Sequence, residues 1–342
     1  MKSRRWVALM TAATLVLGAA VATGAAMAAA PQELVFYSAQ GYDQSEATAF
    51  QNATGIQVKL SDMSTGPLLS KVIAERQNPQ WDVIWFDGNA PMANFDAQGM
   101  LLRRYNPPNL SRYNKLGQGL LPADHAYFPT GVTAAGVIVY STKSVPAKDA
   151  PKTWADLLRP FFKNGVGMNN PAISGPTYPI VAGLMAQMGM AKGEAYFKAL
   201  KANGLIISAT NGVTLQALLD GRIKAAIVQD SAAQALRQAG DAVKIVYPAT
   251  GVVELPSDIA ISAKAPDMAA AKRFVNFVLS ERGQRVMQQE KQAGGDSLFA
   301  PVTKGIKPII ERGGVHWYYL NPVVWGERES SVVSWFTDNV VR

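Results

Sequence analysis

The chain has 342 residues, no cysteine and a formal net charge of +8, with 33 Lys and Arg against 25 Asp and Glu. The lack of cysteine excludes disulfides, a thiol nucleophile and a lipid-modified cysteine at a cleavage point. No long block of like charges occurs and no aromatic residues interleave a basic stripe, so nucleic-acid binding is not indicated.

The N-terminus has the pattern of a cleaved secretory signal peptide. Lys2, Arg4 and Arg5 precede an apolar run, and an A-x-A cleavage pattern ends at Ala28. A membrane anchor is the alternative, but threonines and glycines dilute the run. We expect cleavage near Ala29 and a mature protein free in the periplasm. Because residues 1–28 contain no Asp or Glu, losing these three basic residues lowers the charge from +8 to +5, which mildly favours anionic small molecules.

Short β-prone runs alternate with helical patterns along the mature chain. Strands are expected at 34–39, 56–61, 82–87, 166–169, 205–209 and 223–229. Helices are expected at 43–53, 67–77, 177–189, 191–202 and 212–220. This alternation predicts an α/β protein with parallel strands covered by helices.

Two extended stretches, 132–140 and 252–262, have no helix between them and their neighbouring strands, and we interpret them as crossover strands between two lobes. The predicted organisation is a signal peptide at 1–28, the first part of lobe 1 at 29–133, lobe 2 at 134–250, and a return to lobe 1 with C-terminal helices at 251–342. Two lobes joined by two strands form a hinge with a cleft between them.

Three predicted strand-to-helix junctions combine hydroxyl or amide side chains with glycine. They contain Ser64, Thr65 and Gly66; Ser174, Gly175 and Thr177; and Asn211 with Gly212. Ligands of open α/β sheets lie where strands end and helices begin, and a helix N-terminus offers N–H donors and a partial positive charge. Each junction alone is explained by helix capping. A cleft between the lobes would bring all three together as an anion site.

Acidic and aromatic residues also stand at the expected strand ends. Asp87 and Asp230 close strands and Glu254 lies on the second crossover, where they could recognise an ammonium group, take part in metal binding or, for the two aspartates, cap helices. Ser38 and Tyr42 are further candidate ligand contacts. Three other tyrosines stand at such junctions: Tyr37, Tyr178 and Tyr247. Each of them, like Tyr42, could contact a ligand or could be a half-buried structural residue.

Catalytic patterns are nearly absent. The chain has no G-x-S-x-G or S-x-x-K motif, and its only histidines, His125 and His316, belong to no H-E-x-x-H pattern. We therefore expect a protein that is not an enzyme, without a catalytic residue, resident metal or cofactor. An exported hydrolase remains the rival, because a pair of catalytic carboxylates leaves no sequence pattern.

Several segments carry a resemblance to a known family. They read TGIQVKL (54–60), ERQNPQWDVIW (75–85), PKTWADLLRPFFKNGVGMNNPAISGPTYP (151–179) and AAKRFVNFVLSERGQRVM (270–287). With them the mature chain resembles the extracellular solute-binding proteins of ABC importers, in the branch that includes ferric-ion, 2-aminoethylphosphonate, sugar-phosphate and thiamine binders. The resemblance implies a type II periplasmic binding protein fold and a monomer that delivers a small anionic solute to an inner-membrane permease.

The resemblance bears on the ligand in two ways. In the phosphonate and sugar-phosphate members, the segments that correspond to 64–66 and 174–177 hold the anion, and this chain matches them in residue type. The ferric-binding members carry adjacent tyrosines after the strand that corresponds to 223–229, where this chain reads Gln229-Asp230-Ser231. The resemblance therefore favours a phosphonate or phosphorylated solute, such as 2-aminoethylphosphonate or a sugar phosphate, with ferric ion as the alternative.

Overall fold

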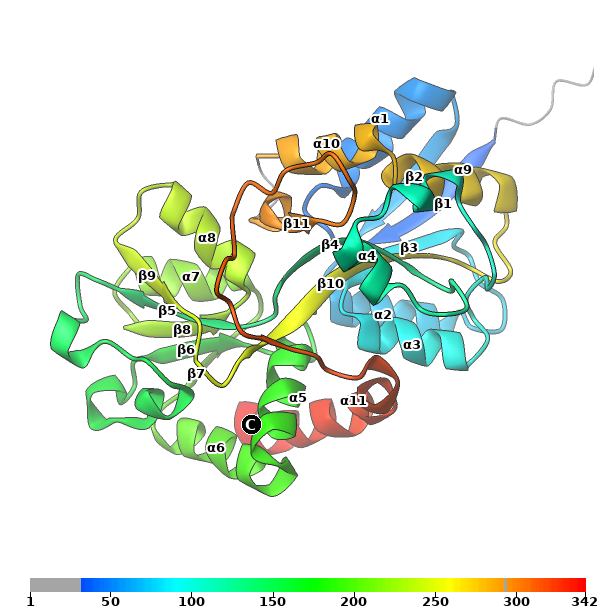
Figure 1. Ribbon diagram of the computed structural model, residues 1–342. Helices are drawn as coiled ribbons and strands as arrows, with labels where there is room; N and C mark the ends of the chain where they lie inside the picture. Colours follow the sequence, from blue (N-terminus) through cyan, green and yellow to red (C-terminus); the bar gives the residue numbers. More distant parts are fainter. Residues whose placement is uncertain (1–31, 292–293) are drawn as a thin grey trace, which may run out of the picture. The chain divides into compact units, whose positions relative to one another are not determined.

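The structure is a computed structural model that describes residues 32–291 and 294–342 (Figure 1). The predicted signal peptide, residues 1–28, lies outside the described residues. Within the described part of the chain, every helix is too short or too polar to cross a membrane.

The first lobe is built on a mixed sheet whose strands run in the order β11-β4-β10-β3-β1-β2, with β12 paired to β10. Its strands are β1 (Glu33–Ser38), β2 (Gln57–Asp62), β3 (Val83–Asp87), β4 (Phe128–Ala134), β10 (Val252–Ile261), β11 (Ala300–Pro301) and β12 (Trp317–Tyr318). Strand β1 is parallel to β2 and β3, whereas β10 is antiparallel to β3 and β4. The parallel strands place their carboxyl ends at one edge of the sheet.

The second lobe is built on a five-stranded sheet with the order β7-β6-β8-β5-β9. Its strands are β5 (Val137–Ser141), β6 (Val166–Asn169), β7 (Ile206–Ser208), β8 (Ala225–Val228) and β9 (Val243–Val246). Strand β6 is parallel to β7 and β8, and β5 is antiparallel to β8 and β9. The expected strands are confirmed, and the structure adds β9, which the sequence analysis missed.

The helices follow the expected alternation. They are α1 (Asp43–Thr54), α2 (Thr65–Ala74), α3 (Asn89–Ala97), α4 (Lys115–Leu120), α5 (Thr177–Met188), α6 (Met190–Ala202), α7 (Asn211–Leu219), α8 (Asp230–Gln238), α9 (Met268–Val278), α10 (Glu281–Gln289) and α11 (Pro322–Phe336). Helices α1, α2, α5, α7 and α8 begin at or just beyond the carboxyl end of a strand, so their N-termini lie where the sequence predicted a ligand site.

The chain passes between the two sheets at the two predicted crossovers. Strand β4 belongs to the first sheet and β5 to the second; the chain returns from β9 in the second sheet to β10 in the first. The lobe boundaries at 133/134 and 250/251 remain a prediction.

Helix α11, which belongs to the segment predicted to return to lobe 1, packs against both lobes. It contacts α3 of the first lobe and α5 of the second. An ideal Cβ on Gly326 would lie 2.4 Å from the carbonyl oxygen of Ala90, so this glycine permits the close approach of α11 to α3. The segment that leads from β11 to α11, residues 302–321, is here called the strap, and it is drawn in orange to red in Figure 1.

The core of the first lobe occupies both faces of its sheet because alternate residues of a strand point to opposite faces. On β3, Val83 and Trp85 join one apolar cluster, and Ile84 and Phe86 join the other. A strand buried on both faces reads as a continuous apolar run, which is why this segment could be predicted from sequence.

Candidate functional site

The loop before α5 touches the start of α2. The backbone N–H of Gly66 donates to the carbonyl of Ile173 at 3.1 Å. An ideal Cβ on Gly66 would lie 1.9 Å from the carbonyl oxygen of Ala172, and one on Gly175 would lie 2.5 Å from Oγ1 of Thr65. Gly66 and Gly175 therefore permit a close approach between two parts of the chain, and the Gly66 N–H has a protein partner.

The hydroxyl of Ser64 at this junction does not cap helix α2. Ser64 is the N-cap residue of α2, yet its side chain makes no capping hydrogen bond, and Ser64 is half-buried. Thr65, the first residue of α2, is buried beside Gly175. Simple capping therefore does not explain Ser64.

In the second lobe, the predicted junctions are linked by a network of neutral side chains. Nδ2 of Asn169, at the end of β6, donates to Oγ of Ser174 at 3.3 Å and to Oδ1 of Asn211 at 2.6 Å. Nδ2 of Asn211 donates to Oε1 of Gln229 at 3.0 Å, and Oγ1 of Thr214 donates to Oδ1 of Asn169 at 2.6 Å. The network joins the ends of β6 and β8 to the starts of α5 and α7.

Thr177, the first residue of α5, is fully buried, and its hydroxyl has no hydrogen-bond partner among the described residues. A buried polar group without a partner is uncommon in folded proteins and calls for a physical reason. The structure thus joins Ser174 and Asn211 through Asn169, and Thr177 begins the helix that follows Ser174; their role as ligand contacts stays a prediction.

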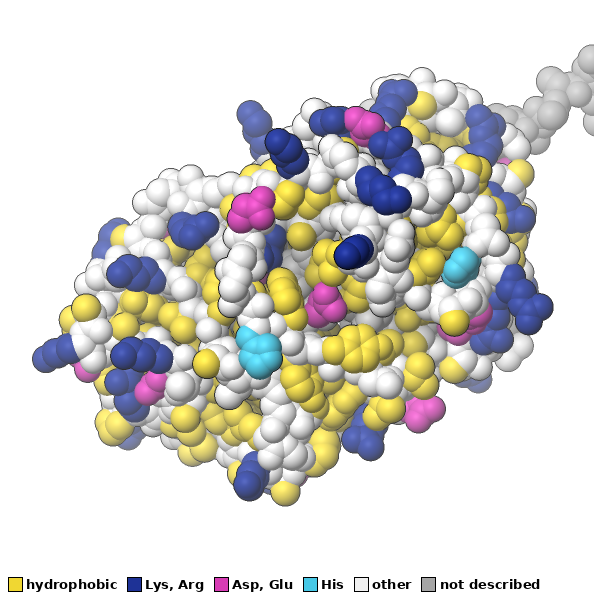
Figure 2. Space-filling model, viewed as in Figure 1, with side chains coloured by type: hydrophobic (Ala, Val, Ile, Leu, Met, Phe, Trp, Pro, Cys, Tyr) yellow, Lys and Arg dark blue, Asp and Glu magenta, His cyan; other side chains and the backbone are white. Residues whose placement is uncertain are grey.

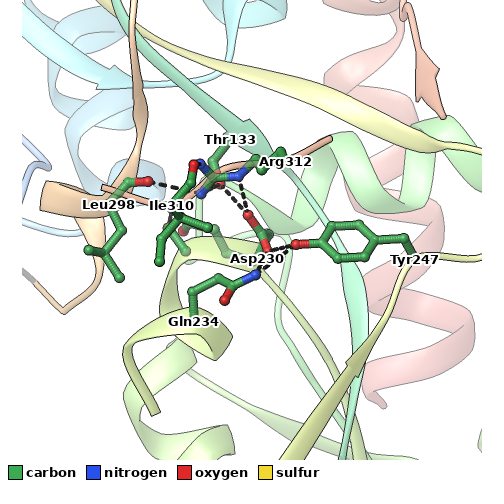
Figure 3. A network of polar contacts seen from close by, with 9 residues as sticks. Thr133, Asp230, Gln234, Tyr247, Leu298, Ile310 and Arg312 are labelled. Atoms are coloured by element: carbon green, nitrogen blue, oxygen red, sulfur yellow. Dashed lines mark hydrogen bonds and ion pairs between the residues drawn. The ribbon is translucent and has the colours of Figure 1, made fainter. Parts of the chain in front are cut away.

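Asp230, which begins α8, is paired with Arg312 of the strap (Figure 3). Nε of Arg312 lies 2.6 Å from Oδ2 of Asp230, and the hydroxyl of Thr133 donates to the same oxygen at 3.1 Å. The hydroxyl of Tyr247 and Nε2 of Gln234 donate to Oδ1. The cation beside this carboxylate is therefore Arg312, and the role of Asp230 toward a ligand ammonium group stays a prediction.

Most N–H groups of the Arg312 guanidinium donate to other groups of the protein. Besides Asp230, its NH2 group lies 2.9 Å from the carbonyl of Leu298 and 3.3 Å from Oγ1 of Thr133, and NH1 donates to the carbonyl of Ile310 at 3.3 Å. The role of Arg312 could not be predicted from sequence, since the strap carries no motif and the pairing depends on tertiary contact.

The other two acidic candidates differ in their surroundings. Asp87 is buried at the end of β3 and accepts from Nε2 of Gln40 at 2.9 Å; burial, and then the charge of Asp296, raises the pKa of Asp87 well above its usual range. Glu254 is half-buried on β10, and burial raises its pKa. A buried carboxyl group with a raised pKa is readily stabilised by a cation.

Ser38 and Tyr42 lie inside the first lobe. Ser38 is buried and accepts from the N–H of Gln40 at 3.1 Å. The ring of Tyr42 packs against Trp85 at 5.0 Å between centroids, and its hydroxyl lies 3.3 Å from Oγ of Ser257. The side chain of Tyr42 belongs to the apolar core, and its role as a ligand contact stays a prediction.

The remaining junction tyrosines also have protein partners. The hydroxyl of Tyr37 donates to the carboxylate of Glu75 at 3.3 Å, and that of Tyr178 donates to the carbonyl of Trp325. These contacts favour the structural interpretation of the tyrosines.

Lys and Arg side chains are scattered over the face shown in Figure 2, in agreement with the dispersed charge of the sequence. Within residues 32–291 and 294–342, no group of three or more His, Cys, Asp or Glu is placed to hold a metal ion.

The comparison with known families defines the class of protein. The family described as "Bacterial extracellular solute-binding protein" matches residues 47–309. The chain belongs to this family, whose members are transport receptors of ABC importers and not enzymes.

The relatives share the family but differ in their named ligands. The chain is 28% identical over 330 residues to the "Probable ABC transporter periplasmic-binding protein y4fP" of Sinorhizobium fredii, covering 93% of this chain and 88% of the relative. It is 27% identical to the "Major ferric iron-binding protein" of Neisseria meningitidis, over 82% of this chain and 85% of that protein. It is 28% identical to the "Putative 2-aminoethylphosphonate-binding periplasmic protein" of Salmonella typhimurium, covering 70% of each.

Solved structures confirm the fold. The periplasmic binding protein AfuA from Actinobacillus pleuropneumoniae, solved with fructose-6-phosphate, superposes with a TM-score of 0.81 at 19% identity, covering 91% of this chain and 99% of AfuA. The protein therefore has the periplasmic binding protein fold, with two α/β lobes.

Proposed function

We propose that this protein is the periplasmic receptor of an ABC importer that captures a small phosphonate or phosphorylated solute and delivers it to the membrane permease. The observation that carries the proposal is the neutral hydroxyl and amide network of Asn169, Ser174 and Asn211 at the starts of α5 and α7. The start of α2, with Ser64 and Thr65, touches the loop that leads into α5.

Such an arrangement suits an oxyanion. Helix N-termini favour negative charge, and neutral donors bind phosphoryl oxygens without the flexibility of long basic side chains. Each lobe supplies part of the site. A solute that contacts both lobes therefore stabilises the closed form over the open one, which is the signal a permease reads.

The sequence relatives allow a second ligand, because a ferric-binding protein is as similar as a phosphonate-binding one. In this chain the position of the expected tyrosine pair is Gln229-Asp230, and Asp230 is bound to Arg312. This pairing favours the anionic solute over the metal.

Thermal unfolding tests the proposal. The mature protein, freed of carried-over ligand by unfolding and refolding, is scanned with 2-aminoethylphosphonate, glucose-6-phosphate, fructose-6-phosphate, inorganic phosphate and ferric citrate. A ligand at a hundred times its Kd adds about 2.7 kcal/mol and moves the midpoint by several degrees. We expect phosphorylated or phosphonate compounds to shift it. A shift with ferric citrate alone, with a coloured complex, overturns the proposal.

Single substitutions test the site. Ser174→Ala and Thr65→Ala are expected to weaken binding of the selected phosphonate or phosphate compound about tenfold each, since each removes a hydroxyl from a desolvated site. Ser111→Ala is the matched control, because Ser111 is exposed and its hydroxyl donates to the backbone carbonyl of Pro108. Unchanged affinity in both site variants, with far-UV circular dichroism intact, contradicts the assignment.

A further inference from the structure

A groove of about 510 Å³ lies beside the candidate anion site, in the first lobe. It is bordered by the carboxyl ends of β1 and β2 and by the first turn of α1. Ser64, which begins the α2 junction, is one of its lining residues, so the groove is continuous with that junction.

Two side chains that line the groove are buried and have an unpaired acceptor atom. Gln40 is 2% exposed; its Nε2 donates to Asp87, and its Oε1 has no partner among the described residues. Asp43 is 4% exposed; its Oδ1 accepts from the N–H of Gln44 at 2.6 Å, and its Oδ2 is likewise unpaired. Unpaired buried acceptors are costly, and a ligand that donates hydrogen bonds removes that cost.

The groove is also lined by the carboxylates of Asp43 and Asp62. In the described part of the chain neither carboxylate forms a salt bridge. Glu290 lies on the same border, where its carboxylate accepts from the hydroxyl of Ser45. Burial, and then the charge of Asp62, raise the pKa of Asp43 to about 6.

We propose that this groove is an ammonium subsite, in which Gln40 Oε1, Asp43 Oδ2 and the carboxylate of Asp62 accept the three protons of a primary amine. The inference rests on the proposed function and narrows it, because the solute is then a zwitterion with an amine at one end and a phosphonate or phosphate at the other. It also replaces Asp87, Asp230 and Glu254 as the expected partners of that amine.

Three probes separate the subsite from the proposed function. Ethylammonium carries only the amine, propylphosphonate carries only the anion with a methyl group in place of the amine, and 2-aminoethylphosphonate carries both. Each is titrated into the mature protein, ethylammonium by NMR against equal sodium chloride and the two phosphonates by calorimetry. The variants are Asp43→Asn and Asp62→Asn, with Asp338→Asn as the control because Asp338 is exposed on the C-terminal turn.

We expect wild type to bind 2-aminoethylphosphonate at least about tenfold more tightly than propylphosphonate. Asp43→Asn should abolish this preference and the ethylammonium response, Asp62→Asn should reduce both, and Asp338→Asn should change neither. If wild type gives no ethylammonium response, or if Asp43→Asn and Asp62→Asn retain it, the subsite is wrong. If ethylammonium binds through Asp43 but neither phosphonate does, the subsite stands and the proposed phosphonate function fails.

Discussion

Nε of Arg312 lies 2.6 Å from Oδ2 of Asp230, and the exposed fractions of the two side chains are 4% and 0%. The pair joins the strap to α8 of the second lobe, and Arg312 also holds the carbonyl of Leu298, which precedes β11 of the first lobe. The buried guanidinium of Arg312 thus bonds to α8, which follows a strand of the second sheet, and to Leu298, which precedes a strand of the first (Figure 3).

Breaking this pair should destabilise the protein strongly. Asp230→Asn and Arg312→Met each leave a buried group without its partner, which costs about 3–5 kcal/mol. We expect urea unfolding to show this loss of unfolding free energy for each single variant. The loss in the double variant should be smaller than the sum of the two single losses. If the two losses add without coupling, the pair does not act as a unit.

The same Asp230→Asn variant separates structure from selectivity. Because Arg312 already neutralises Asp230, the ratio of affinities for 2-aminoethylphosphonate and propylphosphonate should stay within about twofold of wild type. Calorimetry with both compounds measures the ratio. A collapse of the ratio would return Asp230 to the ammonium role that the sequence suggested.

Gly66→Ala should hinder the contact between the start of α2 and the loop before α5. Its Cβ would meet the backbone oxygen of Ala172, which cannot rotate away as a side chain can. We expect the affinity of the Gly66→Ala variant for the selected phosphonate or phosphate compound to fall at least about tenfold, while its far-UV circular dichroism is unchanged. Gly119→Ala is the control, because a Cβ there has no neighbour within 4 Å. Equal affinity in the two variants would mean that the contact plays no part in binding.

Glu46 offers a stabilising substitution. It is fully buried in α1, both carboxylate oxygens lack a hydrogen-bond partner among the described residues, and burial raises its pKa well above the usual range. Glu46→Gln should therefore stabilise the protein little at pH 4 and increasingly towards pH 8. As the pH rises, the unfolded state of the wild type loses the Glu46 proton while the folded state keeps it or ionises the group in the core, and either case lowers wild-type stability. The exposed Glu327→Gln serves as the control, and urea midpoints at both pH values measure the difference.

Ligand-free stability should fall as the pH rises above 4. Burial raises the pKa of both Asp43 and Asp296 to about 6, from an ordinary value of 3.8. The folded state therefore binds more protons than the unfolded state between pH 4 and 6, so this contribution to stability is present below pH 4 and lost through pH 6. Urea midpoints from pH 4 to 7 test the sign, and Asp43→Asn should flatten the slope. A midpoint that rises across this range in both proteins contradicts the assignment.

The strands and most helices could be predicted because their signals are local. The run 82–87 is apolar on both faces, and the helices at 43–53 and 177–189 follow strand ends in the expected rhythm. Strand β9 was missed because it is short and lies at the edge of its sheet, where Val243 alone is buried. Edge strands carry less of the apolar pattern that predicts a strand.

The site was predictable only in part, for a physical reason. Strand ends can be read from sequence, so the starts of α5 and α7, with Ser174, Thr177 and Asn211, could be predicted as strand-to-helix junctions. The partner of a buried charge is chosen by tertiary packing, so Arg312 could not be assigned to Asp230. The sequence places Gly66 and Gly175 at these junctions, but it does not show that another part of the chain lies against them.

Helix α11 lies against α3 of one lobe and α5 of the other, and the strap that leads to it is pinned through Arg312. The chain therefore connects the lobes in three places rather than two. Two flexible crossover strands allow the lobes both to rotate and to twist relative to each other, whereas a third contact restricts this motion to rotations that keep α11 packed against α3 and α5. Opening of this receptor should accordingly follow one rotational coordinate, and a reporter pair on α3 and α5 would stay nearly constant in separation while pairs across the α2 junction change.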